Sequence, residues 1–320
     1  MSRTVNPPPA TTRCQRLLLT GAAGGLGQVL RPRLKPHTNI LRVSDVAPLA
    51  PAEDGEETML CDLADAAAVS SLVQGVDAIV HLGGVSVERP FEDILPANIQ
   101  GVYNLYEAAR VHGVRRVVFA SSNHVIGFYE QGQQLDADVP LRPDGYYGLS
   151  KAYGEHLSRF YFDRYGIETV CLRIGSSFPA PKDRRMLVTW LSYDDLTDLV
   201  TRALFAPDVG HLIVYGASAN RDSWWRDDAA KVLGFVPRTR PSASVRRWKR
   251  SRRCPPTTPP PGIRAARSSR QARFPFPPTP PSRRRHAHNR RTRWRHVVRR
   301  RRKPGMARQR PDVHLDRHPE

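Results

Sequence analysis

The feature that most limits the fold of this chain is an apolar segment that runs directly into a triplet of glycines. Residues 17–20 read Leu-Leu-Leu-Thr, and residues 21–27 read Gly-Ala-Ala-Gly-Gly-Leu-Gly. The spacing G-x-x-G-x-x-G lets the backbone turn tightly, approach a pyrophosphate with bare N–H groups and pack the next helix against a sheet. The segment therefore predicts the first strand and first helix of a parallel sheet.

Short apolar runs alternate with helical stretches through the first 240 residues. We predict strands at residues 16–20, 40–43, 59–61, 78–82, 116–120, 168–174 and 211–214. The clearest helices are predicted at residues 93–112 and 147–165. Near-continuous apolar strands in this order predict a doubly wound parallel sheet, because helices must cover both faces. The fold class is therefore α/β and Rossmann-like. We expect Pro32 to make the first helix short or bent.

The composition changes abruptly near residue 245. Residues 1–245 hold 25 Lys and Arg against 27 Asp and Glu, whereas residues 246–320 hold the other 25 basic residues, only three acidic ones and 13 of the 29 prolines. Such aperiodic sequence cannot bury enough apolar surface to offset its chain entropy. We predict a disordered extension at 1–15, a Rossmann domain at 16–174, a small substrate-binding portion at 175–245 and a disordered basic tail at 246–320.

The basic tail has two interpretations. Its basic residues could bind RNA or DNA by counterion release, which would be nonspecific and salt-sensitive because Phe274, Phe276 and Trp294 form no regular aromatic pattern. The interpretation that we favour is a reading-frame shift in a GC-rich gene, since the helix and strand pattern stops abruptly where Arg and Pro begin to dominate.

Residues that follow neighbouring strands complete a nucleotide-binding pattern. Asp45 ends the second strand 24 positions after Gly21, where a carboxylate accepts both hydroxyls of the adenosine ribose and repels a 2′-phosphate. We therefore predict NAD as the cofactor, in preference to NADP. Asp62 is placed to reach the adenine amino group. The turn beneath the adenosine ribose is predicted at Leu82, Gly83 and Gly84. A plain strand-end turn is the alternative for these positions.

A second group of polar residues lies near the start of the helix predicted at 147–165. Tyr147 and Lys151 are four residues apart, so the phenol and the ammonium share one helix face. A free phenol has a pKa of about 10, and both a nearby ammonium and a positive nicotinamide ring lower it. Ser122, after the fifth strand, can hold a substrate oxygen while Tyr147 removes its proton and hydride leaves to nicotinamide. A solvated helix face is the alternative for Y-x-x-x-K alone.

These features together resemble the extended short-chain dehydrogenase/reductase superfamily over residues 16–240. Five segments are similar to the uronate dehydrogenase family: HLGGVS at 81–86, FASSNH at 119–124, RIGS at 173–176, RMLVTW at 185–190 and YGASAN at 215–220. The resemblance implies NAD-dependent oxidation of a hexuronate, glucuronate or galacturonate, at the anomeric carbon to the aldarolactone. A sugar-nucleotide epimerase or dehydratase is the alternative, but it needs a larger C-terminal lobe than residues 175–240 provide.

The resemblance implies a role for each matching residue. Tyr147 is the base, Lys151 lowers its pKa and binds the nicotinamide ribose, and Ser122 positions the reacting hydroxyl. Arg185 binds the carboxylate, for which a planar guanidinium is suited. The sugar contacts are Ser86, Ser122, Asn123, His124 and Ser176. The further cofactor contacts are Gly21, Gly24, Gly25, Leu26, Gly27, Leu63, Asn98, Ser121 and Ile174. Ordinary turn, loop or solvated residues are the alternative for Ser86, His124, Ser176 and Arg185.

Several classes of protein are disfavoured by the sequence. The chain has no apolar run of about 18 residues and no apolar stretch near its start, so we predict a cytoplasmic protein without a membrane segment. The cysteines show neither C-x-x-C spacing nor nearby histidines, so we expect no metal site and no disulfide; they are Cys14, Cys61, Cys171 and Cys254. The expected partners are a small sugar acid and further copies of this chain in a homo-oligomer.

Overall fold

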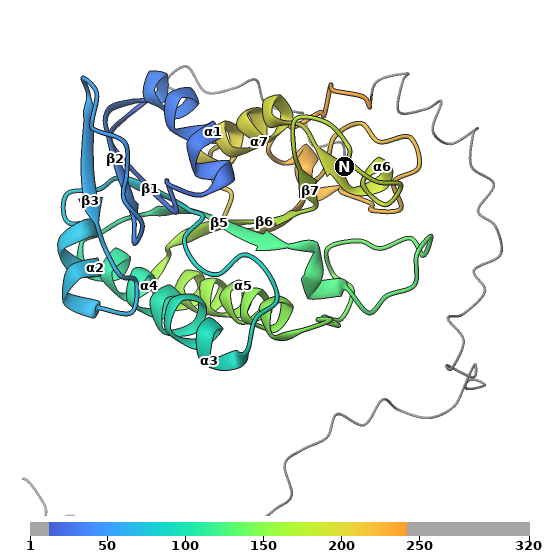
Figure 1. Cartoon of the computed structure of the whole chain (residues 1–320), viewed down its shortest axis with the longest axis horizontal. Helices are drawn as coiled ribbons and strands as arrows, with labels where there is room; N and C mark the ends of the chain where they lie inside the picture. The colour runs from blue at the N-terminus through green and yellow to red at the C-terminus, as the bar shows by residue number, and fades with distance from the viewer. Residues whose placement is uncertain (1–12, 242–320) are drawn as a thin grey trace, which may run out of the picture. The chain divides into compact units, whose positions relative to one another are not determined.

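In the computed structural model, which describes residues 13–241, seven parallel strands form one sheet with helices on both faces (Figure 1). The strands are β1 (Cys14–Thr20), β2 (Thr38–Asp45), β3 (Glu56–Leu60), β4 (Ala78–His81), β5 (Arg116–Ser122), β6 (Glu168–Ile174) and β9 (His211–Gly216). Their order in the sheet is β3-β2-β1-β4-β5-β6-β9. The chain reverses direction across the sheet between β1 and β4, where such folds have a crevice. The predicted Rossmann-like α/β fold is confirmed.

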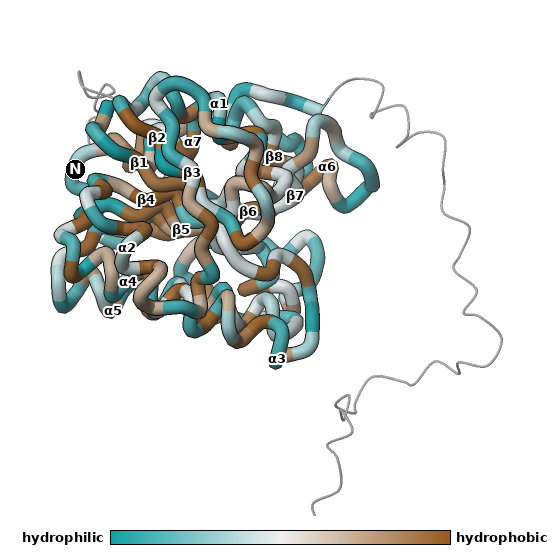
Figure 2. The backbone as a smooth tube through the Cα atoms, turned by 60° about the vertical axis from the view of Figure 1, so that its left-hand side comes forward, coloured by the Kyte–Doolittle hydropathy of each residue, from teal (hydrophilic) through white to brown (hydrophobic). Residues whose placement is uncertain are grey.

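Two hydrophobic layers hold the helices to the sheet. Helices α1 (Gly25–Leu34) and α7 (Tyr193–Phe205) cover one face, and α2 (Ala66–Val73), α4 (Gly101–Val111) and α5 (Tyr146–Tyr165) cover the other (Figure 1). Because side chains alternate along a strand, Leu17 and Leu19 pack in the first layer and Leu18 in the second. The strands are accordingly hydrophobic through the centre of the molecule (Figure 2).

The first strand begins earlier than predicted. Cys14 pairs with Thr38 of β2 and packs against the first hydrophobic layer, so residues 14 and 15 belong to the sheet and not to a disordered extension. Arg13 is also described, and its side chain donates to the Thr38 carbonyl at 3.1 Å; residues 1–12 of that extension lie outside the described residues. The same holds for the basic tail at 246–320 and for the nucleic-acid contacts predicted for it.

The helix predicted at 93–112 consists of three consecutive segments. They are α3 (Phe91–Ile94), a π-helical turn η2 (Leu95–Gln100) and α4. Pro96 has no N–H for the α-helical ladder, which explains the wider turn at this point. Gly101 then lies so close to Leu63 that a Cβ atom would be 2.6 Å from the Leu63 Cβ. In α1, Pro32 lies in the last turn, and the helix ends after ten residues in a 3₁₀ turn, η1 (Lys35–His37).

The chain after β6 contributes to the main sheet and to a smaller unit beside it. The smaller unit contains the two-stranded parallel sheet β7 (Ser176–Ser177) and β8 (Trp190–Leu191), with the short helix α6 (Met186–Thr189) between them. Two 3₁₀ turns, η3 (Asn123–Ile126) and η4 (Ala229–Lys231), complete the elements. A substrate-binding role for residues 175–245 stays a prediction. None of the helices within residues 13–241 is long and apolar enough to cross a bilayer.

A buried ion pair connects α5 to the centre of the sheet. The Arg173 side chain donates from Nε and Nη2 to the two carboxylate oxygens of Glu155, each at 2.9 Å, and both side chains are almost fully buried. The Ser121 hydroxyl donates to the same carboxylate at 2.6 Å. The carboxylate thereby joins α5 to the ends of β5 and β6.

We predict that Arg173→Leu lowers the free energy of unfolding by about 3–5 kcal/mol, because it leaves the Glu155 carboxylate buried without a cationic partner. Arg159→Leu is the control: it removes the same charge from an ion pair with Asp163 whose side chains are both more than half exposed, and should change the stability far less. Urea unfolding measures both. Equal losses in the two variants would contradict the assigned importance of the buried pair.

Candidate active site

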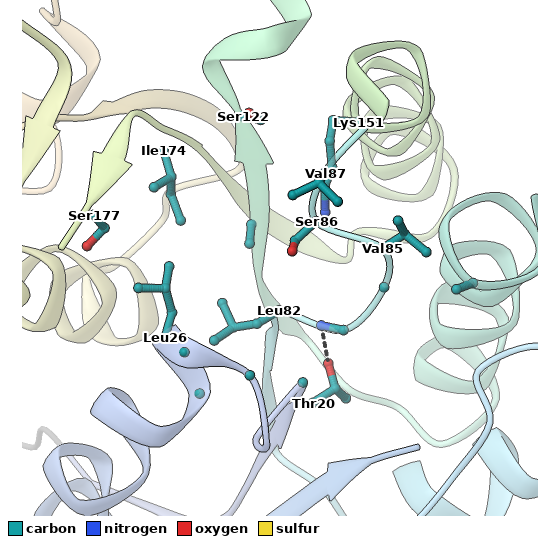
Figure 3. Close-up of a pocket in the computed structure, with 18 of the residues that line it drawn as sticks. Thr20, Leu26, Leu82, Val85, Ser86, Val87, Ser122, Lys151, Ile174 and Ser177 are labelled. Carbon is teal, nitrogen blue, oxygen red and sulfur yellow. Dashed lines mark hydrogen bonds between the residues drawn. The ribbon is translucent and has the colours of Figure 1, made fainter. Parts of the chain in front are cut away.

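A cleft of about 860 Å³ opens at the carboxyl ends of the central strands. All of the residues predicted to bind cofactor or substrate line this cleft, with the exception of Asn98. Figure 3 shows Lys151 reaching from α5 toward the loop that carries Ser86, with Leu26, Leu82 and Ile174 across the cleft. The fold thus gathers residues that are up to 164 positions apart in the sequence, from Gly21 to Arg185.

The glycine turn is shaped by close backbone contacts. Gly21 has φ +71°, and a Cβ atom there would lie 2.7 Å from the carbonyl carbon of Leu82. At Gly27 a Cβ atom would collide with the carbonyl oxygen of Gly21. No side chain caps the first turn of α1, so its amide groups remain available to an anion. The turn therefore fits the pyrophosphate of a dinucleotide.

The two aspartates expected at the adenosine end lie on neighbouring strands. The Asp45 carboxylate accepts hydrogen bonds from the backbone N–H of Ala23 and of Ala47, each at 3.0 Å, so it is fixed to the glycine turn. Asp62 follows β3 and accepts from the N–H of Ala64 at 2.9 Å. Both line the cleft, and their contacts with ribose and adenine stay predictions.

A buried pair that the sequence patterns did not reveal joins β1 to the turn after β4. The Thr20 hydroxyl lies 2.7 Å from Nδ1 of His81 and accepts a hydrogen bond from the N–H of Gly83 at 3.2 Å (Figure 3). Burial, together with the nearby Lys151 ammonium, lowers the pKa of His81 to about 3, so the ring is neutral. The signal that could have identified these residues is their place at the ends of two adjacent strands.

Tyr147, Ser122 and Lys151 meet at the centre of the cleft. Burial raises the pKa of the Tyr147 phenol, and a hydrogen bond with Ser122 acts in the opposite direction. Burial also lowers the pKa of the Lys151 ammonium, to about 8. The ammonium lies 5.8 Å from the centre of the Tyr147 ring and 5.2 Å from that of Phe119. The lowering of the Tyr147 pKa by Lys151 and nicotinamide stays a prediction.

His124 is oriented by an aspartate that the sequence analysis missed. Its Nδ1 lies 2.9 and 3.0 Å from the two carboxylate oxygens of Asp144, and its ring packs edge-on against Tyr147 at 5.5 Å between centres. A Cβ atom at Gly127 would collide with that carboxylate. Asp144 thereby fixes the ring and leaves Nε2 for another partner. It lies in an irregular segment without a motif, so no sequence signal distinguished it.

The other end of the cleft combines short polar side chains with one arginine. Arg185 is exposed, and within residues 13–241 its guanidinium forms neither an ion pair nor a hydrogen bond. Ser86 and Asn123 also line the cleft, and the Ser176 hydroxyl lies 3.2 Å from that of Thr189. A small polyol with one negative charge is the kind of molecule that such a surface can bind.

Asn98 differs from its predicted role as a cofactor contact. Its side chain is buried, and its amide group donates to the Val85 carbonyl and to the Ser150 hydroxyl, both at 2.9 Å. Its carbonyl oxygen accepts from the Val85 N–H at 2.7 Å. The side chain therefore holds the loop after β4 instead of facing the cleft. Ser121 does line the cleft, although its hydroxyl is bound to Glu155.

The family was established by comparison with known proteins. A family model described as "NAD dependent epimerase/dehydratase family" matches residues 17–233. The chain belongs to this family. The sequence is 65% identical over 228 residues to uronate dehydrogenase from Pseudomonas syringae pv. tomato, which covers 71% of this chain and 83% of the relative. It is 54% identical over 247 residues to uronate dehydrogenase from Agrobacterium fabrum, covering 77% of this chain and 91% of the relative.

Solved structures lead to the same group of relatives. A mutant of uronate dehydrogenase from Agrobacterium tumefaciens, solved in complex with NAD, is 52% identical and has a TM-score of 0.73, with 76% of this chain and 92% of the other covered. Sugar-nucleotide enzymes of the family are more distant. A dTDP-glucose 4,6-dehydratase from Mycolicibacterium smegmatis, for example, is 26% identical over 65% of this chain and 74% of its own length.

We predict that Lys151→Met stabilises the cofactor-free protein at pH 7 by up to about 3 kcal/mol, because an ammonium with a lowered pKa is costly to bury. The folded pKa is about 8 and the unfolded value 10.5. The wild type therefore gains stability as the pH rises from 8 through 10.5, and the advantage of the variant disappears over that range.

Chemical unfolding of both proteins between pH 7 and pH 10 measures this difference. Lys231→Met is the control, because that side chain is exposed and paired only with Asp228; it should change stability little. A loss of stability in Lys151→Met at pH 7 would show that burial of the ammonium is not costly here.

Proposed function

We propose that this protein is an NAD-dependent dehydrogenase that oxidises the anomeric hydroxyl of a hexuronate, glucuronate or galacturonate, to the aldarolactone. The observation that carries the proposal is one cleft lined by the glycine turn, by Tyr147 and Ser122, and by Arg185, whose guanidinium has no partner within residues 13–241. Sequence identities of 65% and 54% to two uronate dehydrogenases support the same activity.

Proton removal is assigned to Tyr147. Ser122 lines the cleft together with the phenol, and its hydroxyl would hold the reacting hydroxyl of the sugar beside Tyr147. The phenol has to become a phenolate in the reactive complex, and a cation close to the ring favours this form. Lys151 provides that cation from the next turn of α5. NAD, when bound, would supply the hydride acceptor at the nicotinamide ring.

Recognition of the substrate is assigned to the polar end of the cleft. Arg185 would bind the uronate carboxylate, because a guanidinium offers two parallel donors to two oxygens. Ser86, Asn123, His124 and Ser176 would bind the ring hydroxyls. A free sugar acid is favoured over a sugar nucleotide as substrate, because the chain is 65% identical to a uronate dehydrogenase and 26% identical to a dTDP-glucose 4,6-dehydratase.

The surface and the cysteines support two further proposals, a homo-oligomer and a cytoplasmic location. Helices α4 and α5 expose large apolar side chains on neighbouring surfaces, and extended apolar patches on proteins are commonly covered by a partner. A second copy of this chain is the proposed partner; the exposed residues are Tyr103, Val111, Phe160 and Tyr165. In the described part of the chain Cys14, Cys61 and Cys171 are free thiols, which suits a reducing compartment.

We predict that the protein with NAD forms NADH from glucuronate or galacturonate, and that Tyr147→Phe lowers kcat about 10²–10⁴-fold because it removes the general base. Tyr146→Phe is the control, since that neighbouring side chain is half exposed and does not line the cleft. The absorbance of NADH measures both. Full turnover by Tyr147→Phe would refute the assigned base, and NADH formation with UDP-sugars alone would refute the substrate.

We predict that Arg185→Leu lowers kcat/KM for glucuronate roughly 10- to 100-fold, the value of a hydrogen bond to a charged group. The slower oxidation of glucose, which has no carboxylate, should not decline. Arg184→Leu removes the same charge next to the site, from a side chain that does not line the cleft, and should leave both rates unchanged. A parallel decline for the charged and the neutral sugar would show that Arg185 does not bind the carboxylate.

A further inference from the structure

The loop after β4 carries Ser86 into the cleft but belongs to no helix or strand. It comprises residues 82–90, between β4 and α3. Its first part is fixed by Asn98, which binds both the N–H and the C=O of Val85 and continues to Ser150 of α5. Beyond Val85, a second attachment is needed to fix the position of Ser86, and the structure provides one.

The second attachment is the carboxylate of Glu88. Its Oε1 accepts a hydrogen bond from the N–H of Tyr146, and its Oε2 accepts one from the N–H of Tyr147, both at 2.9 Å. These are the first two amides of α5, which have no partner within the helix. The N-cap residue is Gly145, which has no side chain to bind them. Glu88 is therefore the side chain that caps this helix.

The surroundings of Glu88 are adapted to this contact. A Cβ atom at position 145 would collide with the Glu88 carboxylate, so the contact depends on Gly145. Three residues after Glu88, the Phe91 ring packs against the Tyr146 ring at 5.6 Å between centres. Glu88 itself is exposed, so it contributes little to the hydrophobic core. The carboxylate at a helix N-terminus is also favoured by the helix dipole.

We propose that Glu88 is a positioning residue of the active site, which fixes the loop carrying Ser86 to the backbone of Tyr147. This inference rests on the proposed function, because it concerns how sugar and base are aligned. Both attachments of the loop meet at the backbone of Tyr147. Its N–H donates to Glu88, and its C=O accepts from the Ser150 hydroxyl. The same hydroxyl accepts a hydrogen bond from Asn98. Ser86 lies between the two attachments and is held at a set position relative to the phenol.

The kinetic test compares Glu88→Ala with Glu92→Ala. Misplacing a reacting group by about 1 Å can cost about 10²-fold in rate, so Glu88→Ala should lower kcat/KM for glucuronate roughly 10- to 100-fold, mainly through kcat. The Kd for NAD should change less than about twofold, because the loop attachments hold Ser86 and not the glycine turn. Glu88→Gln keeps one acceptor oxygen and should lie between the wild type and Glu88→Ala.

Glu92→Ala is the matched control. It removes the same charge four residues further on, from a carboxylate that forms no hydrogen bond or ion pair within residues 13–241, and should keep wild-type kinetics. Wild-type kcat and KM in Glu88→Ala would overturn the proposal. A loss of NAD affinity as large as the loss for the sugar would overturn it too, since the change would then be a general destabilisation.

Hydrogen exchange tests the same attachment without any substrate. Glu88→Ala should accelerate exchange of the amides of Tyr146 and Tyr147 and of residues 86–89, and leave β1 unchanged. If the wild-type protein oxidises no uronate, the proposed function fails, while this measurement still decides whether Glu88 fixes the loop. Unchanged exchange at these amides would overturn the proposal in that case.

Discussion

The position of helix α5 over the ends of β5 and β6 is the constraint on which the site depends. The buried pair of Glu155 and Arg173 sets it, because a carboxylate without its guanidinium at this depth would cost several kcal/mol. Glu155 lies one turn after Lys151 on α5. Its carboxylate accepts a hydrogen bond from the hydroxyl of Ser121, which is the residue before Ser122. The ion pair therefore determines how the phenol, the ammonium and the strand-end hydroxyl meet, although none of its own atoms needs to contact a ligand.

Burial of ionisable groups in the cleft opposes stability but prepares the site for chemistry. The same desolvation that raises the pKa of Tyr147 lowers that of Lys151 to about 8, so the phenol is neutral and the lysine still an ammonium near pH 7 until further charges enter. A nicotinamide ring and an anionic sugar would bring such charges together with the removal of water, and low dielectric then strengthens each interaction. The neutral His81 beneath this site adds no charge that would compete with the ammonium.

The sequence predicted what depends on local pattern, and missed what depends on contacts between distant loops. The seven strands of the main sheet, the glycine turn and the Tyr147–Lys151 pair follow from periodicity and spacing within short windows. Asp144 and Glu88 show no such pattern, and Glu88 reaches the amide of Tyr147 across 59 positions. The family resemblance implies a cofactor contact for Asn98, but the π-helical turn around Pro96 places its amide against Val85. A prediction from one sequence cannot locate a side chain whose partner is backbone in another loop.

The charges that line the cleft are separated by the order of the strands. Asp45 ends β2 and Asp62 follows β3 on one side of the switch point, whereas Lys151 and Arg185 come from segments that follow β5 and β6 on the other. An acidic end disfavours a second phosphate on the adenosine ribose, and a cationic end attracts an anionic sugar. Both ends belong to one cleft, so the topology of the sheet places carboxylates at the end proposed for the adenosine and cations at the end proposed for the sugar acid.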